Sequence, residues 1–238
     1  MNSIVDIVIL LLIGIGAVIG FKHGAVRRLT TFIGTLVIAI IAFKFKNNLS
    51  VLMYENLPFF RFGGIIKGVE VLNILLYELL AFVIIFLALT LILRILIVIS
   101  GLLEKILKMT IFLSIPSKIL GIFVGAFEWY IYTFLILVVV SVPVFNLKSY
   151  LDDSKLATFM LEDTPILSPL AKTTVDTYTE VYTTIKDSKN EESIEVNDKI
   201  VRILIKNEIV TRESIEKLVN RGKIFLSESY LKELNISK

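Results

Sequence analysis

Residues 71–93 read VLNILLYELLAFVIIFLALTLIL, and this stretch decides the class of fold. Only Asn73 and Glu78 interrupt its apolar character. An α-helix needs about 20 consecutive, mainly apolar residues to cross a hydrocarbon core of about 30 Å. We therefore expect residues 71–93 to form a membrane-spanning helix.

Three further apolar stretches surround this one. We predict spans over residues 4–21 and 29–43, and a fourth span that ends near Phe145. Each is too apolar to stay in water, and each is flanked by charged residues. No positive charge precedes the first stretch and no small-residue cleavage site follows it, which favours a permanent helix over a signal peptide. The sequence thus predicts an all-α membrane protein with four transmembrane helices.

Charge divides the chain near residue 146. Residues 1–145 hold 11 Lys and Arg against 6 Asp and Glu, a net charge of +5, whereas residues 146–238 hold 14 against 16, a net charge of −2. We predict a membrane domain over residues 1–146, a polar helix and linker over 147–195, and a small helical tail over 196–238. The basic residues lie where anionic lipid head groups are found, so the basic pI does not indicate nucleic-acid binding.

The composition argues against most enzyme chemistry. The chain has no cysteine and one histidine, which excludes disulfides, thiolate metal sites and cysteine nucleophiles and disfavours histidine triads and zinc motifs. It also lacks the H-E-x-x-H, G-x-S-x-G and Walker sequences. We therefore predict no catalytic residues, no metal ligands and no cofactor, and we expect a protein that is not an enzyme.

Glycines recur four residues apart in two of the predicted spans. The first set is Gly16, Gly20 and Gly24, and the second is Gly121 and Gly125. This spacing puts each set on one helix face, where a neighbouring backbone can approach closely. We expect these residues to pack helices together, within the chain or between copies. For Gly24 a second reading stays open, in which it only makes the turn after the first span.

Two short segments around these glycines resemble a known family. Residues 20–24 (GFKHG) precede two arginines, and residues 117–121 (SKILG) lead to Gly125. Together with Asp6 and the number and order of spans, they resemble the colicin V production protein (CvpA) family of four-span bacterial inner-membrane proteins. The resemblance covers about residues 3–146. One departure is Trp129, where the family often has a third small residue. The resemblance implies a role in toxin production or envelope processes, without an agreed biochemical activity.

Four charged residues fall inside or near the spans, where a charge costs on the order of 2.5–3.5 kcal/mol. We expect Asp6 and Glu78, near the starts of their spans, to reach the interface, and Arg94 can extend toward it likewise. Glu128 lies deeper. It either pairs with Arg94 on an antiparallel neighbour, or lies among head groups if the fourth span begins only at Trp129.

The connections and the tail carry weaker signals. Residues 102–108 predict an amphipathic surface helix, and residues 51–68 an interfacial wedge or, alternatively, the lining of a pathway. Residues 186–198 are typical of a solvated linker. Asn197 and Thr211 are candidate helix N-caps, and Gly222 is a candidate stop. A helical unit this small is expected to dock on the membrane domain, on another copy or on a partner, or else to be weakly ordered.

Lysine and arginine in the short connections set the expected orientation. Positive charges favour the cytoplasm for the first connection (residues 22–28) and the third connection (residues 105–118). Positive charges over residues 44–67 favour the cytoplasm for the second connection instead. We predict a bacterial plasma-membrane protein with both termini outside the cytoplasm. Its expected partners are the lipid bilayer, a second copy and an envelope protein bound through the tail, but no nucleic acid. The leading function is a non-enzymatic scaffold in toxin secretion or envelope maintenance. A small homo-oligomeric pore or transporter is the second reading, and a membrane enzyme the third.

Overall fold

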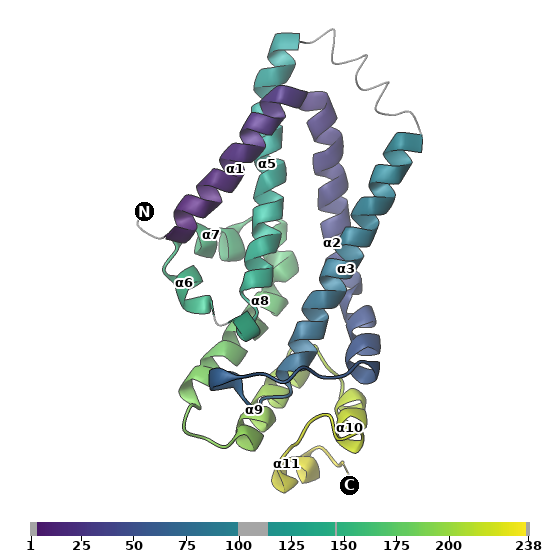
Figure 1. Ribbon diagram of the computed structural model, residues 1–238, viewed down its shortest axis with the longest axis vertical. Helices are drawn as coiled ribbons and strands as arrows, with labels where there is room; N and C mark the ends of the chain where they lie inside the picture. The colour runs from purple at the N-terminus through teal and green to yellow at the C-terminus, as the bar shows by residue number, and fades with distance from the viewer. Residues whose placement is uncertain (1–3, 100–113, 146, 237–238) are drawn as a thin grey trace. The chain divides into compact units, whose positions relative to one another are not determined.

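Helices are the secondary structure of the described part of the chain. The computed structural model describes residues 4–99, 114–145 and 147–236 (Figure 1). The long helices are α1 (Ile4–His23), α2 (Ala25–Asn56), α3 (Leu72–Ile99) and α5 (Ser114–Val140). The shorter ones are η1 (Gly64–Ile66), η2 (Pro143–Phe145), α6 (Lys148–Asp152), α7 (Lys155–Asp163), α8 (Leu167–Asp187), α9 (Ser193–Lys206), α10 (Arg212–Asn220) and α11 (Glu228–Glu233). No strand occurs in these residues.

Four helices are long and apolar enough to cross a membrane, which confirms the predicted class. They cover Ile4–His23, Thr31–Asn56, Leu72–Leu96 and Ser117–Val140. The second helix is longer than predicted, because α2 does not stop at Phe43. No proline interrupts it before Pro58, and a proline disfavours helix in the residue that precedes it. Part of the predicted interfacial segment is therefore helical, and residues 57–71 form the loop that contains η1.

Contacts divide the chain into two compact units, each built from span and tail segments. The first unit comprises Met1–Lys44, Val83–Val139 and Ser149–Ala171. The second comprises Phe45–Phe82, Val140–Lys148 and Lys172–Lys238. Both units draw on residues from either side of residue 146. The predicted division at that residue therefore describes a change in polarity, not the units in which the chain packs.

In the first unit, α1 lies against α5, and α7 lies beside the start of α1 (Figure 1). Many large apolar side chains point outward from these helices and from the later part of α3. Examples are Ile7, Leu11 and Val18 on α1, Leu87 and Leu91 on α3, and Phe123 and Phe127 on α5. Such contiguous apolar faces mark contact with lipid. The first unit therefore carries the lipid-facing surface of α1 and α5.

The second unit has an interior like that of a water-soluble helical domain. Val71 and the first four residues of α3, 72–75, are all buried, as is Tyr54 near the end of α2. The tail helices α8, α9 and α10 are amphipathic and bury one face each, with Tyr178, Ile200 and Leu218 in the interior. The tail thus packs on span residues of its own chain, one of the options that the sequence left open.

The local structure of the tail corrects two expectations. The predicted linker over residues 186–198 is short, because α8 runs to Asp187 and α9 begins at Ser193. Asn197 is not an N-cap but a buried residue inside α9. Thr211 caps α10 as predicted, since its side chain accepts a hydrogen bond from the Ser214 N–H. The amphipathic helix predicted over residues 102–108 lies outside the described residues.

Gly222 follows the end of α10 with a φ of 63°, in the left-handed region that favours glycine. Its N–H donates to the carbonyl of Val219 at 2.9 Å. This confirms the predicted stop.

Candidate functional site

Arg28 and Glu128 form a buried ion pair in the first unit. Arg28 Nη1 lies 2.7 Å from Glu128 Oε2, and the glutamate side chain is only 3% exposed. Tyr132 Oη lies 3.5 Å from the other carboxylate oxygen and 3.1 Å from Thr35 Oγ1. The pair suggested by the sequence, Glu128 with Arg94, is not among the ion pairs of the described residues, and Arg94 is exposed.

The depth of Glu128 follows from the continuity of α5. This helix runs unbroken from Ser114 to Val140 through both Glu128 and Trp129. A span that begins only at Trp129, with Glu128 among head groups, is therefore not what the structure shows. Arg28 belongs to the first turns of α2 rather than to a free connection, which brings its guanidinium to the carboxylate.

Lys46 and Glu78 form a second buried pair, in the second unit. Lys46 Nζ contacts Glu78 Oε1 and donates to Thr174 Oγ1 of α8 at 2.8 Å. Lys46 is 6% exposed and Glu78 is fully buried. Glu78 is therefore not exposed to solvent, because its partner Lys46 lies between it and Thr174 of the tail. A buried charge costs several kcal/mol unless it is paired, so loss of either partner would leave the other group buried without compensation.

Asp6 is also buried, at 2% exposure, and holds α7 in the first unit. Its Oδ1 accepts hydrogen bonds from Ser154 Oγ at 2.5 Å and from the Leu156 N–H at 3.1 Å. Ser154 is itself the N-cap of α7, accepting from the Ala157 N–H at 3.0 Å. A carboxylate at a helix N-terminus is stabilised by the free N–H groups there. Asp6 thus lies at the start of its span, as predicted, but it is covered by α7 rather than exposed to solvent, because the tail supplies its donors.

The structure brings four of the five predicted packing glycines into one contact between α1 and α5. A Cβ added to Gly16 would lie 2.6 Å from the Gly125 carbonyl oxygen, and one added to Gly20 would lie 2.8 Å from the Gly121 carbonyl carbon. Real Cβ atoms essentially never come so close. We call this contact the glycine seam. Only glycine at these positions lets the two backbones approach so closely.

Gly24 makes the turn that ends α1. Its φ is 76°, and its N–H donates to the Gly20 carbonyl at 2.9 Å. The glycine faces were also candidates for contact with a second copy of the chain. In the structure they contact each other within one chain. Self-association stays a proposal, and it requires another surface.

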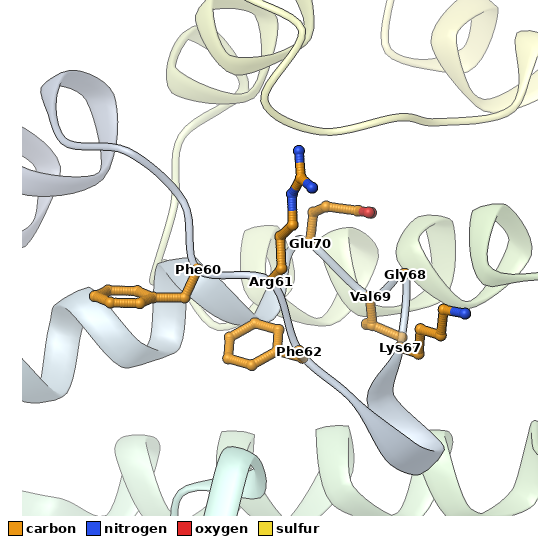
Figure 2. Close-up of a pocket in the computed structure, with 7 residues that line it drawn as sticks. All are labelled: Phe60, Arg61, Phe62, Lys67, Gly68, Val69 and Glu70. Atoms are coloured by element: carbon orange, nitrogen blue, oxygen red, sulfur yellow. The ribbon is translucent and has the colours of Figure 1, made fainter.

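A pocket of about 260 Å³ lies along the loop between α2 and α3 in the second unit. Its lining residues are Phe60, Arg61, Phe62, Lys67, Gly68, Val69 and Glu70 (Figure 2). In that view the side chains of Arg61 and Glu70 extend to the same side of the loop, away from the Phe62 ring. Arg61 and Lys67 are exposed. The pocket thus presents two cations beside aromatic rings.

Side chains of α3 fix the first part of this loop. The amide of Asn73 accepts from the Phe60 N–H at 2.7 Å and donates to the Phe60 carbonyl at 3.0 Å. Tyr77 Oη donates to the Pro58 carbonyl at 2.5 Å. An amide that satisfies both polar groups of one backbone residue holds that residue in place.

Side chains of α9 fix the second part. Ser193 Oγ donates to the Lys67 carbonyl at 3.2 Å, and Asn197 Nδ2 donates to Gly68 and to Glu70 Oε2. The loop is therefore held on one side by α3 and on the other by the tail. This is how a rigid scaffold positions a binding loop.

Several of these residues were not singled out from the sequence. Lys46 was counted as a loop charge, and Arg28 as part of a basic connection. Thr174 and Ser154 carry no motif. For Lys46 a signal did exist, because no glycine or proline separates it from the preceding apolar helix. Among the described residues, no group of three His, Cys, Asp or Glu side chains could hold a metal ion.

These features define an integral membrane protein. Four span helices lie among its described residues, Glu78 and Glu128 pair with cations of α2, and the tail packs on span residues. The sequence model of the colicin V production protein family matches residues 5–165. Because the match covers more than half of the chain, the chain belongs to this family. The resemblance expected from the glycine segments is thereby confirmed.

A curated relative supports the same assignment. The chain is 33% identical over 171 residues to an uncharacterized transmembrane protein, YshB, of Bacillus subtilis (strain 168). The match covers 69% of this chain and 93% of the relative. The comparison with solved structures gives no significant match.

Proposed function

We propose that the protein is a non-enzymatic scaffold of the bacterial plasma membrane, which acts in toxin production, secretion or envelope maintenance. The observation that carries this proposal is the loop over residues 57–71, held rigid by α3 and by the tail. Toxin production comes from the name of the family alone. A rigid loop on a multi-span protein suits the recruitment of a partner, because little order is lost on binding.

The partner that this loop fits is an envelope protein with an acidic segment. Arg61 and Lys67 are exposed, and neither occurs in an ion pair among the described residues. The carboxylate of Glu70, by contrast, accepts from Asn197 Nδ2 at 3.1 Å. Exposed cations near aromatic rings favour carboxylates, which Arg can bind through two parallel hydrogen bonds.

Contacts within each unit bear on the orientation. Lys67 and Ser193 are hydrogen-bonded, and the two spans α3 and α5 lie between them in the chain. Asp6 and Ser154 are hydrogen-bonded with all four spans between them. Contacting residues must lie on the same side of the bilayer, and an even number of crossings allows this. We propose that both termini and the second loop share the extracytoplasmic side.

Photocrosslinking in intact cells tests the scaffold. A photoreactive amino acid at Arg61 should give a discrete heteromeric adduct, and the charge reversal Lys67→Glu should reduce its yield at least fivefold. The same amino acid at the lipid-facing Leu91 is the matched control and should give none. Adducts of equal yield with and without the charge reversal would count against the acidic partner, and no adduct from Arg61 would count against the scaffold.

The second reading, a small pore or transporter, has one supporting observation. Arg28, Glu128, Tyr132 and Thr35 form a polar group between α2 and α5 in the first unit. Intramembrane ionisable residues often mark an ion pathway. Purified protein in liposomes would then conduct ions, and Glu128→Gln would abolish the flux. Flux no greater than in empty liposomes would leave the scaffold as the proposal.

A further inference from the structure

A second cavity of about 400 Å³ lies in the first unit, outside the features used so far. One wall comes from the span helices α2 and α5, with Phe32 and Phe127, whose ring centroids are 6.5 Å apart. The other wall comes from Phe159 of α7 and the turn that leads into α8. We call this cavity the α7 groove. Its volume lies in the range of small-molecule sites, about 300–1,000 Å³.

The lining of the α7 groove is apolar. Its hydroxyl groups, those of Tyr130 and Thr164, are hydrogen-bonded to each other. A water-filled cavity would need polar groups with free hydrogen-bonding capacity, and a polar ligand would need the same. The groove therefore suits a hydrocarbon chain.

The mouth of the groove is built by an unusual turn. Ile166 has a φ of 70°, which a β-branched residue rarely adopts, and its side chain is 61% exposed. Ser168 Oγ accepts from the Thr164 N–H at 2.7 Å, and the Leu167 N–H donates to the Pro165 carbonyl at 2.9 Å. These bonds hold the turn in place. Phe159, at 52% exposure, stands on the same wall.

The position of α7 identifies what covers these side chains. The 20 residues of α1 give a helix of about 30 Å, the thickness of a hydrocarbon core, so its first residues lie at the bilayer boundary. Asp6 holds the start of α7 at that end of α1. The groove also continues into the lipid-facing surface, because Phe127 is an exposed residue of α5. Lipid is therefore the neighbour of Phe159 and Ile166.

We propose that the α7 groove binds an acyl chain of a membrane phospholipid at the bilayer boundary. Phe159 and Ile166 enclose the chain from the tail side, and Phe32 and Phe127 enclose it from the span side. The site anchors α7, and through it the start of the tail, to the membrane. This inference does not depend on the scaffold function.

Tryptophan fluorescence tests the contact with lipid. The chain has one tryptophan, so Trp129→Phe gives a silent background into which Phe159→Trp is introduced. The purified protein is reconstituted in phosphatidylcholine vesicles with or without bromine atoms on the acyl chains. Bromine should quench at least half of the emission. Phe225→Trp, at a residue 54% exposed in the second unit, is the matched control and should lose less than a tenth.

Native mass spectrometry tests the groove itself. Leu36 of α2 also lines the groove. The wild-type protein should retain a phospholipid after mild detergent extraction, and Leu36→Trp, which fills the groove, should lower the retained fraction at least tenfold. Leu36→Met is the conservative control. Should Leu36→Trp fail to fold, Phe159→Ala removes one wall at an exposed position and should lower retention as well. Absence of quenching at residue 159, or equal lipid retention in all variants, would overturn the proposal.

Discussion

Glu78 and Glu128 each lie buried on a span helix beside a cation of α2. At the scale of single residues, these contacts allow charged side chains to lie on the buried faces of span helices. Removing one partner leaves an uncompensated charge, whereas removing both can be nearly neutral. The pairs therefore specify which helix faces meet more than they add to stability.

The pair in the second unit gives the first prediction. Lys46→Met or Glu78→Gln alone should destabilise the protein by about 3–5 kcal/mol, because the remaining group is buried without a partner. The double change Lys46→Met with Glu78→Gln should cost less than the two single changes added together. Unfolding by denaturing detergent measures this, with the exposed Lys44→Met as the control. Costs that simply add would show that the two residues act independently.

The pair in the first unit gives the second prediction. Glu128→Gln and Arg28→Gln should each lower the thermal midpoint by several degrees, since breaking a buried pair costs about 3–5 kcal/mol. Exchanging the two residues should restore at least half of the loss. Arg94→Gln is the matched control and should change the midpoint little, because Arg94 is exposed. A larger loss from Arg94→Gln would favour the pairing first expected from the sequence.

The partner of Glu128 shows what could be predicted at this scale. The sequence marks Glu128 as deep, because a short carboxylate cannot reach the interface. It does not show which helix lies opposite, because that depends on the rotation of each helix about its axis. Arg28 lies at the start of α2, and its long side chain extends to Glu128 on α5. The spacing of residues along the sequence does not show that these two side chains meet.

At the scale of elements, the glycine seam determines how α1 meets α5. The four-residue spacing was visible in the sequence, and so was the close approach that it permits. That the two sets face each other within one chain was not visible, because the spacing is the same for contact between copies. The end of α2 was predicted too early, at Phe43, for a related reason. The polar residues near Lys46 are typical of a connection between spans, and only the structure shows that Glu78 and Thr174 lie beside Lys46.

The seam gives the third prediction. Gly20→Ala should destabilise the protein by about 1–3 kcal/mol or more, because its Cβ would overlap the backbone of Gly121. Gly14→Ala is the matched control on the same helix, since a Cβ there meets nothing within 4 Å. Thermal unfolding of the two variants in detergent should differ by several degrees. Equal midpoints would mean that α1 and α5 do not pack through the seam.

Tyr178 of α8 gives the fourth prediction. Burial raises the pKa of its phenol above the ordinary value of about 10. Because the folded-state pKa is raised, its stabilising contribution is complete below pH 10 and is lost as the pH rises through and above that value. Stability should fall by up to about 1.4 kcal/mol per pH unit in that range. Tyr178→Phe should remove this part of the slope in denaturant titrations at pH 9–12, and an unchanged slope would refute the assignment.

At the scale of the whole molecule, the chain is organised by pairs of distant segments rather than by consecutive domains. The sequence after residue 146 is polar and looks like a separate tail. Its helical and polar character was predicted correctly. Its contacts were not, because Asn197, Thr174 and Ser154 are ordinary helix and turn residues whose partners lie more than 100 residues away. A single sequence carries no signal for such pairings.

Orientation gives the fifth prediction. Asn190→Cys, exposed between α8 and α9, should react in intact cells with a membrane-impermeant thiol reagent, whereas Lys118→Cys, exposed near the start of α5, should not. The nearby Ser188 is buried at 5% exposure and would not serve as a probe. The chain has no cysteine of its own, so the background is silent. The reverse pattern would place the tail in the cytoplasm.

The hydrogen bond between Asp6 and Ser154 also sets an order of events during biogenesis. The two residues are 148 positions apart, and chains grow at about 5–20 residues per second, so Asp6 is synthesised about 7–30 s before its partner Ser154. In that interval the Asp6 carboxyl group lacks the hydrogen bonds that Ser154 and the Leu156 N–H donate in the folded chain. Release of the nascent chain between residues 140 and 154 would therefore leave the first helix packed on α5 through the glycine seam but without α7 held at its start.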